Sequence, residues 1–451
     1  MYRNAAVTRA AVTFAGVCGA LTLRPRAQRH HRTGSPVRFY LKVPHGMPFS
    51  STDALGTLLT DALGWGLGAM SAVGTLYTMA AVDSARRFFA PRRSGKGEGI
   101  GEPAPAVTVL RPLHGAEPGL AARLRALTTQ EYAGPVQVVC GVQAHDDPAI
   151  AIVKDLIAEL EAVGSPVRLD LVVDTTRHGA NAKISNVINL MAVARHEVLV
   201  LADSDIAVAP DYLARVVDAL TRPGVGLVTC LYRGDPVDAG SFWQDQAARA
   251  VDHHFLPNVL VGLRLGLAKP CFGSTIALTD QTLARIGGFA AFRDILADDH
   301  AMGMAVRALG LAVAVPPFVV GHLSPESNLG AVLTHELRWA RTIRGLDPGG
   351  YAGSIVTHPV PLALIGAIFA GWHAWSLLLL GLAVAARLVL QVTIDARITR
   401  SRPRWPGLIR DVLSFLVFVA SFGIRRVSWR GQRFSVKSDG TMVPVGENGG
   451  S

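Results

Sequence analysis

The chain has 451 residues, of which 50% are hydrophobic and 17% charged, and its formal net charge is +10. These values exclude an intrinsically disordered chain, and the low share of charged residues points to segments that enter a membrane. The basic excess does not indicate nucleic-acid binding, because no Lys/Arg-rich stretch is interleaved with aromatic side chains that could stack on bases. The four cysteines form no CxxC pair, which argues against a disulfide framework or a structural zinc site and favours a reducing compartment.

Residues 1–53 are expected to form an N-terminal extension that is mostly disordered. Its apolar stretch, residues 11–23, is 13 residues long, which is shorter than the roughly 20 residues that a membrane-spanning helix needs. Two interpretations remain open for it: a poor signal peptide, or an unstructured extension upstream of a translation start near Met47.

Residues 54–85 are predicted to form a transmembrane helix. The 21 residues from 62 to 82 carry no charge, which is about the length needed to cross the hydrocarbon core. A basic linker, residues 86–104, follows and begins with Arg86 and Arg87, whereas Asp61 precedes the apolar stretch. The positive-inside rule therefore places the next part of the chain in the cytosol.

Residues 348–436 are predicted to return to the membrane. No Asp, Glu, Lys or Arg occurs between positions 348 and 386, a length that suffices for a hairpin of two helices joined near His373. The next apolar run, residues 412–424, is short and flanked by arginines, so we expect it to lie in the interface or to form a re-entrant helix. Residues 437–451 are expected to be a tail, and the whole pattern predicts a multi-pass membrane protein.

The intervening residues 105–347 have the pattern of a cytosolic α/β domain. Short aliphatic runs alternate with longer helix-like stretches, which is typical of a parallel, doubly wound sheet. The predicted strands are residues 107–110, 136–142, 167–173, 198–201 and 226–232. About 240 residues suffice for one sizeable core, and ligands of such sheets bind beyond the carboxyl ends of the strands.

Asp203 and Asp205 follow directly on the predicted strand at 198–201, with Ser204 between them. Two carboxylates at this spacing suit a Mg or Mn ion that bridges a diphosphate, because hard cations prefer oxygen ligands. The same motif also occurs as a solvated turn after a strand, and an isolated DxD is a weak signal. Asp203 and Asp205 are thus candidate metal ligands, and Asp203 is also a candidate contact of the nucleotide sugar.

Two further polar segments are candidates for donor binding. Asp147 follows the predicted strand at 136–142 and can hold a base or ribose, although a carboxylate before Pro148 is also a good helix cap. Lys183 and Asn186 lie at a polar helix start that can bind a phosphate, and here too capping is the alternative.

Asp299 is the candidate catalytic residue. It lies in the sequence ADDH, where a carboxylate can take the proton from an acceptor hydroxyl as that hydroxyl attacks the sugar; the alternative is again a helix cap. In the segment HELRW, Arg338 can pair with the diphosphate and Trp339 can form an apolar wall. Near a membrane, a Trp and an Arg are otherwise common interfacial anchors.

His253 and His254 are adjacent on a predicted helical stretch. Because adjacent helical positions point about 100 degrees apart, the two rings cannot easily bind one ion. At most one of them, His254, is expected to face the acceptor. The surrounding residues 242–267 are interpreted either as a segment along the bilayer surface or as core packing.

Together these features resemble a known family. The order of Asp147, Asp203, Asp299 and the HELRW box, with a helix before the domain and a hairpin after it, resembles the family 2/21 glycosyltransferases of ceramide glucosyltransferase type. The segments RPLHGAEPGL, GVQAHDDPAI, HGANAKISN, LADSDIAV, KPCFGSTIAL and HELRWARTIR look like those of bacterial glycosyltransferases of hopanoid biosynthesis. The resemblance covers roughly residues 55–434.

The resemblance implies a GT-A fold and an inverting transfer from a UDP-sugar, expected to be UDP-N-acetylglucosamine, to a polyol hopanoid lipid, bacteriohopanetetrol. It assigns the nucleotide to Asp147, the metal and diphosphate to Asp203 with Asp205, and proton abstraction to Asp299. Arg338 and Trp339 match the RW of the family box, whose first position is usually Gln or Arg and here is His335. The implied location is the bacterial inner membrane, with the catalytic domain in the cytosol.

Three other functions compete with this interpretation. Ceramide glucosylation differs only in the acceptor. A processive polysaccharide synthase would need more helices for an export channel and Gln in place of His335. A non-catalytic membrane scaffold that binds a nucleotide and a cation is the alternative from a different class.

Overall fold

The computed structural model describes residues 51–90, 103–398, 407–423, 427–429, 432–436 and 442–444. Contacts group the chain from Leu55 onward into one unit. Most of the predicted N-terminal extension, much of the basic linker and most of the predicted tail lie outside the described residues.

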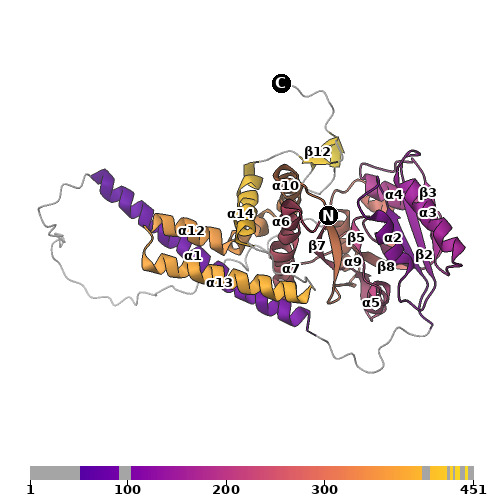
Figure 1. Cartoon of the computed structure of the whole chain (residues 1–451), viewed down its shortest axis with the longest axis horizontal. Helices are drawn as coiled ribbons and strands as arrows, with labels where there is room; N and C mark the ends of the chain where they lie inside the picture. Colours follow the sequence, from indigo (N-terminus) through magenta and orange to yellow (C-terminus); the bar gives the residue numbers. More distant parts are fainter. Residues whose placement is uncertain are drawn as a thin grey trace, which may run out of the picture. The chain divides into compact units, whose positions relative to one another are not determined.

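A seven-stranded sheet forms the centre of the α/β domain, in the order β3-β2-β1-β4-β8-β6-β9 (Figure 1). Its strands are β1 (Val107–Pro112), β2 (Val136–Val142), β3 (Arg168–Val173), β4 (Val198–Leu201), β6 (Val225–Val228), β8 (Ile276–Thr279) and β9 (Ala312–Ala314). The four strands from β3 to β4 run parallel, as expected, and all their residues apart from those of β3 are buried.

The predicted parallel sheet did not include β8, which makes the sheet mixed. This strand pairs antiparallel with β4 and with β6. Ile276 pairs with Leu201, so β8 starts where β4 ends, and a strand that enters at that edge must run the opposite way. The predicted strand at 226–232 is also divided, because its second half belongs to another sheet as β7 (Leu231–Pro236).

Helices cover both faces of the central sheet. One core cluster joins the sheet to α2 (Leu120–Thr128), α3 (Ala149–Ala162) and α5 (Tyr212–Leu220). A second cluster joins the opposite face to α4 (Ala182–Met191), α8 (Asp280–Arg285), the short η2 (Phe289–Phe292) and α9 (Asp298–Ala308). In β4, Val200 belongs to the first cluster and Leu199 and Leu201 to the second, which is the alternation of a strand buried on both sides.

A three-stranded sheet, β5-β10-β7, lies beside the end of β4. It comprises β5 (Ile206–Ala207), β10 (Val319–Ser324) and β7, and it is followed along the chain by α10 (Leu329–Leu346). Between β7 and β8 the chain forms α6 (Phe242–Ala250), a π-helical turn η1 (Val251–Phe255) and α7 (Leu256–Arg264). Leu256 and Leu260 are buried against α1 and α13. This contact agrees with both interpretations of residues 242–267, because α1 and α13 are themselves predicted membrane segments.

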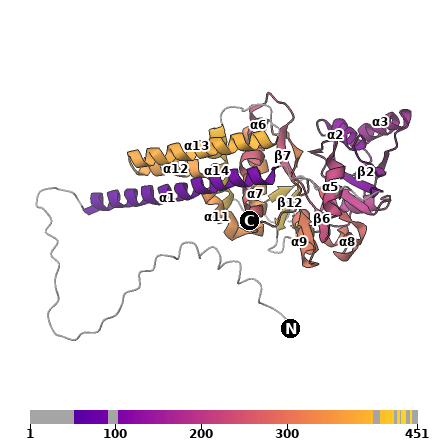
Figure 2. The ribbon, with the colours of Figure 1, turned by 90° about the horizontal axis from the view of Figure 1, so that it is seen from below.

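The apolar segments form α1 (Ser51–Phe88), α11 (Pro348–Gly353), η3 (Ser354–Thr357), α12 (Pro359–Phe369), α13 (Ala374–Arg397) and α14 (Gly407–Gly423). α1, α12 and α13 lie side by side in both views (Figures 1 and 2). Small residues permit this contact, since a Cβ added at Gly64 would lie 3.1 Å from the backbone of Ala370. His373 precedes α13, so the hairpin turns at the predicted place.

By length and composition, α13 is the one described helix that can cross a membrane, and the pair formed by residues 348–357 and α12, bent by 68°, is at most a second span. α1 is helical where predicted, but it does not meet this criterion, because glycine, threonine and serine dilute its hydropathy. Its membrane insertion stays a prediction. α14 covers the predicted interfacial segment, and a small sheet of β11 (Val427–Trp429), β12 (Gln432–Val436) and β13 (Met442–Pro444) follows, its last strand within the predicted tail.

Candidate active site

The Asp203-Ser204-Asp205 turn connects β4 of the large sheet to β5 of the small one. Asp203 Oδ1 lies 2.7 Å from the Lys183 ammonium. Asp205 Oδ2 lies 3.4 Å from His322 Nε2, while Asp205 Oδ1 is buried and has no hydrogen-bond partner in the described part of the chain. The turn therefore presents two partly exposed carboxylates at the carboxyl edge of the sheet, as its sequence position predicts.

Asp299 reaches the same place from a segment 96 positions later in the chain. It lies in the first turn of α9, and its Oδ2 accepts a hydrogen bond of 3.0 Å from the backbone N–H of Gly273. The carbonyl of Gly273 in turn accepts a 3.3 Å hydrogen bond from the backbone N–H of Asp203. A Cβ built on Gly273 would lie 2.5 Å from Asp203 Oδ2, so Asp203 and Asp299 meet on the two sides of one glycine.

Burial and neighbouring carboxylates raise the pKa of Asp299 and Asp203. Burial is the largest cause for Asp299, followed by the nearby charge of Asp298, and together they raise its pKa to about 6 although Lys183 opposes the shift. Burial and then Asp205 raise the pKa of Asp203 against the same cation. For Lys183, burial favours the neutral amine, but Asp203, Asp298 and Asp299 outweigh it and raise its pKa. The lysine thus stays charged and holds the acidic cluster together.

Two arginines, to which the sequence analysis assigned no role, donate hydrogen bonds to backbone carbonyls of the Asp203-Ser204-Asp205 turn. Arg111, fully buried in β1, donates to the carbonyls of Asp203 at 2.6 Å and Ile206 at 2.9 Å. Arg123 donates to the carbonyl of Ser204 at 2.9 Å. A lone arginine within the apolar strand VTVLRP was the available signal, since a buried arginine needs partners.

Asp147 and Asn186 have structural contacts in the present arrangement. The Asp147 carboxylate accepts hydrogen bonds from the backbone N–H groups of Gly115 and Ala149, at 2.9 to 3.1 Å, so the capping alternative describes its contacts. The Asn186 amide donates to the carbonyl of Gly141 at 2.8 Å and is buried. Of the two polar residues proposed at the α4 start, Lys183 lies in the acidic cluster and Asn186 does not. Their predicted roles toward a nucleotide stay predictions.

An aromatic cluster adjoins Asp205 on one face of the small sheet. The ring of Trp339 lies 5.6 Å from His322, 4.8 Å from His335 and 6.2 Å from Tyr232, measured between centroids. The predicted box on α10 therefore forms a wall of the site. The guanidinium of Arg338, in the same box, has no hydrogen bond or ion pair with the described residues; burial lowers the pKa of Arg338, and the charge of Asp205 opposes this shift.

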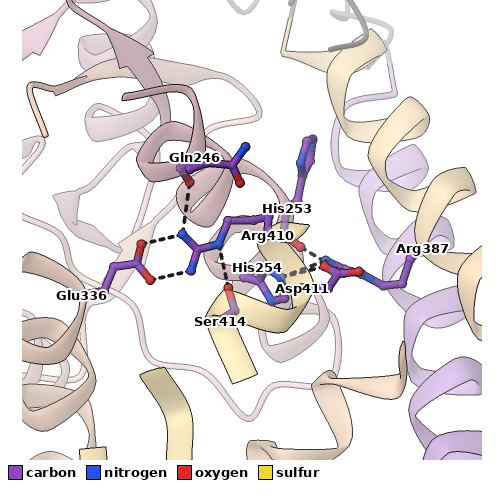
Figure 3. A network of polar contacts seen from close by, with 8 residues as sticks. All are labelled: Gln246, His253, His254, Glu336, Arg387, Arg410, Asp411 and Ser414. Carbon is purple, nitrogen blue, oxygen red and sulfur yellow. Dashed lines mark hydrogen bonds and ion pairs between the residues drawn. The ribbon is translucent and has the colours of Figure 1, made fainter. Parts of the chain in front are cut away.

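His254 lies elsewhere, in a buried polar network shown in Figure 3. Its Nε2 lies 2.9 Å from Asp411 Oδ1 and 3.0 Å from Arg387 Nη2. Burial and then Arg387 lower the pKa of His254 to about 4, so its ring is neutral near pH 7. The structure brings this histidine to the helices α13 and α14 and not to the acidic cluster, and its predicted acceptor role stays a prediction.

The donor set fits a divalent cation only in part. Within the described residues, no three His, Cys, Asp or Glu side chains are placed to hold a metal ion by themselves. Mg²⁺, however, is commonly bound through one or two carboxylates together with substrate phosphates and water. The orphaned Oδ1 of Asp205 and the carboxylate of Asp203 are suited to this incomplete kind of site.

These features have a counterpart among known proteins, because the model of glycosyl transferase family 21 matches residues 66–442. The chain belongs to this family. The match begins within α1 and covers the α/β domain and the C-terminal helices. The predicted resemblance to glycosyltransferases of ceramide glucosyltransferase type is confirmed at the level of the family.

Curated relatives of this family 21 member include fungal and animal proteins. Ceramide glucosyltransferase of Komagataella phaffii is 28% identical over 116 residues, which are 26% of this chain and 23% of that protein. Ceramide glucosyltransferase 1 of Caenorhabditis elegans is 25% identical over 220 residues, or 47% and 44% of the two chains. The chain thus spans less than half the length of the curated relatives it matches.

Solved structures show only a broad likeness of fold. Mannosyltransferase PcManGT from Pyrobaculum calidifontis, in complex with GDP-Man and Mn²⁺, has 22% sequence identity and a TM-score of 0.46, over 81% of this chain and 98% of its own. Glucosyl-3-phosphoglycerate synthase from Mycobacterium tuberculosis, with Mn²⁺, UDP and phosphoglyceric acid, has 16% identity and a TM-score of 0.34, over 56% and 83%. For the family 21 chain, the α/β architecture agrees with expectation, and the GT-A fold stays a prediction.

Proposed function

We propose that this family 21 protein transfers a sugar from a UDP-sugar to a hydroxyl of a membrane lipid, with inversion at the sugar carbon. The observation that carries the proposal is the meeting of Asp299 and Asp203 at Gly273, at the carboxyl edge of the central sheet. This arrangement joins a carboxylate with a raised pKa to a pair of carboxylates suited to a cation and a diphosphate.

Asp299 serves as the general base. With a pKa of about 6 it is mostly ionised at pH 7, yet it is more basic than an ordinary aspartate. It takes the proton of the acceptor hydroxyl while the hydroxyl oxygen forms a bond to the anomeric carbon and the bond from that carbon to the diphosphate oxygen breaks. One displacement from the face opposite the leaving group inverts the configuration.

The leaving UDP carries negative charge that must be stabilised. A divalent cation, Mg or Mn, held by Asp203 and Asp205 would neutralise part of the diphosphate. The Arg338 guanidinium, which has no hydrogen bond or ion pair with the described residues, is suited to a diphosphate oxygen, because guanidinium groups bind such oxygens through paired hydrogen bonds. Trp339 and His335 would close the site on the side of α10.

The acceptor side is proposed from the apolar helices. α13 is long and apolar enough to span a membrane, and α7 packs against it, so the catalytic domain would work at the bilayer surface. Basic residues after the apolar segments favour the cytosolic face of a bacterial inner membrane. The acceptor proposed from the sequence motifs is bacteriohopanetetrol and the sugar N-acetylglucosamine. Ceramide is the second candidate acceptor, and the ceramide glucosyltransferases among the relatives favour it.

The test uses the full-length chain purified into lipid nanodiscs. Labelled UDP-N-acetylglucosamine and UDP-glucose are each supplied with bacteriohopanetetrol or ceramide, and lipid-linked label is measured. The proposal predicts transfer to a lipid in at least one combination, and the combination identifies donor and acceptor together. Absence of lipid-linked label in all four would overturn it and leave the non-catalytic scaffold as the better interpretation.

A further inference from the structure

Arg410 of α14 is fully buried and lies outside the acidic cluster. Its guanidinium donates to both carboxylate oxygens of Glu336, at 2.7 and 2.6 Å, to Ser414 Oγ at 3.0 Å and to the carbonyl of Gln246 at 3.3 Å (Figure 3). Paired hydrogen bonds of this kind fix orientation as well as distance. Arg410 therefore defines where Glu336, and with it the middle of α10, lies relative to α14.

Glu336 lies inside the box that forms a wall of the proposed donor site. His335 and Trp339 are four positions apart and share one face of α10, with ring centroids 4.8 Å apart. Glu336 and Arg338 differ by two positions, which is about 200 degrees of helical rotation, so the two side chains leave the helix in nearly opposite directions. α10 is thus held through Glu336 and presents Arg338 on the opposite face, while Trp339, three positions after Glu336, lies only about 60 degrees from it.

Apolar contacts also join α10 to α14. Ala340 of α10 is buried in a cluster with Val417 and Phe418 of α14, and Leu333 and Leu337 pack against it. These contacts press the two helices together but do not specify rotation, because apolar packing is not directional. Directional contacts between α10 and α14 include the bidentate ion pair and a hydrogen bond from Arg344 to the carbonyl of Ser421, and of these the ion pair lies within the HELRW box.

The neighbouring residue on α14 connects the same helix to α13. Asp411 accepts hydrogen bonds from Arg387 Nε at 3.1 and 3.0 Å, and both side chains are almost completely buried. α14 therefore joins α10 to the described helix that is long enough to span a membrane. α10 is therefore connected, through α14, to a helix outside the α/β domain.

We propose that Arg410 is a positioning residue of the transferase: through its ion pair with Glu336 it sets the rotation of α10 so that Arg338 faces the diphosphate site beside Asp205. The inference rests on the proposed function. It predicts that loss of the Glu336–Arg410 ion pair impairs use of the donor but not of the acceptor, and that this loss acts through Arg338.

The test measures donor and acceptor kinetics of the full chain in nanodiscs for Glu336→Gln, Arg338→Ala and the double variant. We expect Glu336→Gln to lower kcat/KM for the donor by up to about a hundredfold, the loss that a misplacement of about 1 Å can cause, with the acceptor KM unchanged. The double variant should lose no more than Arg338→Ala alone, because both changes remove one interaction. Losses that multiply in the double variant, or equal changes in both KM values, would overturn the inference.

Two further variants cover the case in which Glu336→Gln does not fold. Arg410→Lys keeps a cation at the buried position but loses the paired geometry, so it should show the same donor-specific loss. The exchange Arg410→Glu with Glu336→Arg should recover most of the donor kcat/KM, and failure to recover in a folded exchange variant counts against the proposal.

The matched control is Asp245→Asn, which breaks a buried ion pair with Arg249 within α6. It should lower the unfolding temperature without a donor-specific change in KM. If wild-type protein transfers no sugar at all, the proposed function fails. If wild-type protein is active and the Glu336 and Arg410 variants match the control, only the positioning role fails.

Discussion

Lys183 Nζ lies 2.7 Å from Asp203 Oδ1, and the ammonium is largely buried between α4 and the end of β4. The same ammonium is 3.4 Å from Asp298 Oδ2, so one cation serves several carboxylates. Counted with Asp205 and Asp299, the cluster keeps a net negative charge, which repels a diphosphate. The geometry therefore favours a donor that arrives with a divalent cation.

Gly273→Ala should abolish most transfer while the protein still folds. The added Cβ would lie 2.5 Å from Asp203 Oδ2 and 2.9 Å from Lys183 Nζ, so the ion pair must move, and displacement of a catalytic group by about 1 Å can cost roughly a hundredfold in rate. Gly345→Ala on α10, where nothing lies within 4 Å of the new Cβ, is the control. Equal kcat/KM for the two variants would show that the Gly273 contact is not critical.

Asp299→Asn should reduce kcat by about a hundredfold to ten-thousandfold, the usual contribution of a general base. The amide keeps the shape of the side chain and can still accept the hydrogen bond from Gly273, so UDP binding should persist. Calorimetric titration with UDP, run beside the transfer assay, checks both halves. Unchanged turnover would rule out Asp299 as the base.

The pH profile of donor kcat/KM should fall on the acid side with an apparent pKa of about 6, because only the ionised Asp299 accepts a proton. Lys183 lowers the pKa of Asp299 and Asp298 raises it. Lys183→Met should therefore move the acid limb to higher pH, and Asp298→Asn should move it to lower pH, whatever either change does to the maximal rate. If both variants shift the acid limb in the same direction, or if neither shifts it, the assignment of this limb to Asp299 is contradicted.

The site residues that could be predicted from the sequence are those that directly follow a strand or begin a helix. Asp203 comes directly after a run of buried aliphatic residues, and Lys183 and Asp299 lie at helix starts, so their edge of the sheet follows from α/β geometry. Their meeting at Gly273 could not be predicted, because it depends on β8 entering the sheet in the reverse direction.

Contacts between distant helices were also beyond sequence reasoning. Glu336 and Arg410 are 74 positions apart in the sequence, so no local pattern predicts their pairing. His254 is another example: as an isolated residue it suggested an acceptor contact, while its actual partners, Asp411 and Arg387, are supplied by α14 and α13. Such pairs are chosen by tertiary packing, which a pattern along one segment does not encode.

Arg111→Lys should destabilise the protein and reduce its activity. The lysine keeps the charge but loses the fork that donates to the carbonyls of Asp203, Ser204 and Ile206. Net losses of about 1 kcal/mol for each of the three broken hydrogen bonds give about 3 kcal/mol. A lower unfolding temperature by circular dichroism, with a parallel fall in transfer, is expected, and the exposed Arg222→Lys, whose pair with Asp218 is at the surface, serves as control.

Removal of divalent cations should stop transfer, and Asp205→Asn should weaken cation use without unfolding the protein. The described side chains provide no three-ligand cage, so an ion must share its coordination with the diphosphate, and chelation with EDTA should act quickly and reversibly. Asp205→Asn removes the charge of the oxygen that has no partner, so the Mn²⁺ concentration for half-maximal rate should rise. Full activity in EDTA, with wild-type kinetics for Asp205→Asn, would mean that the cluster meets the diphosphate through Lys183 and Arg338 alone.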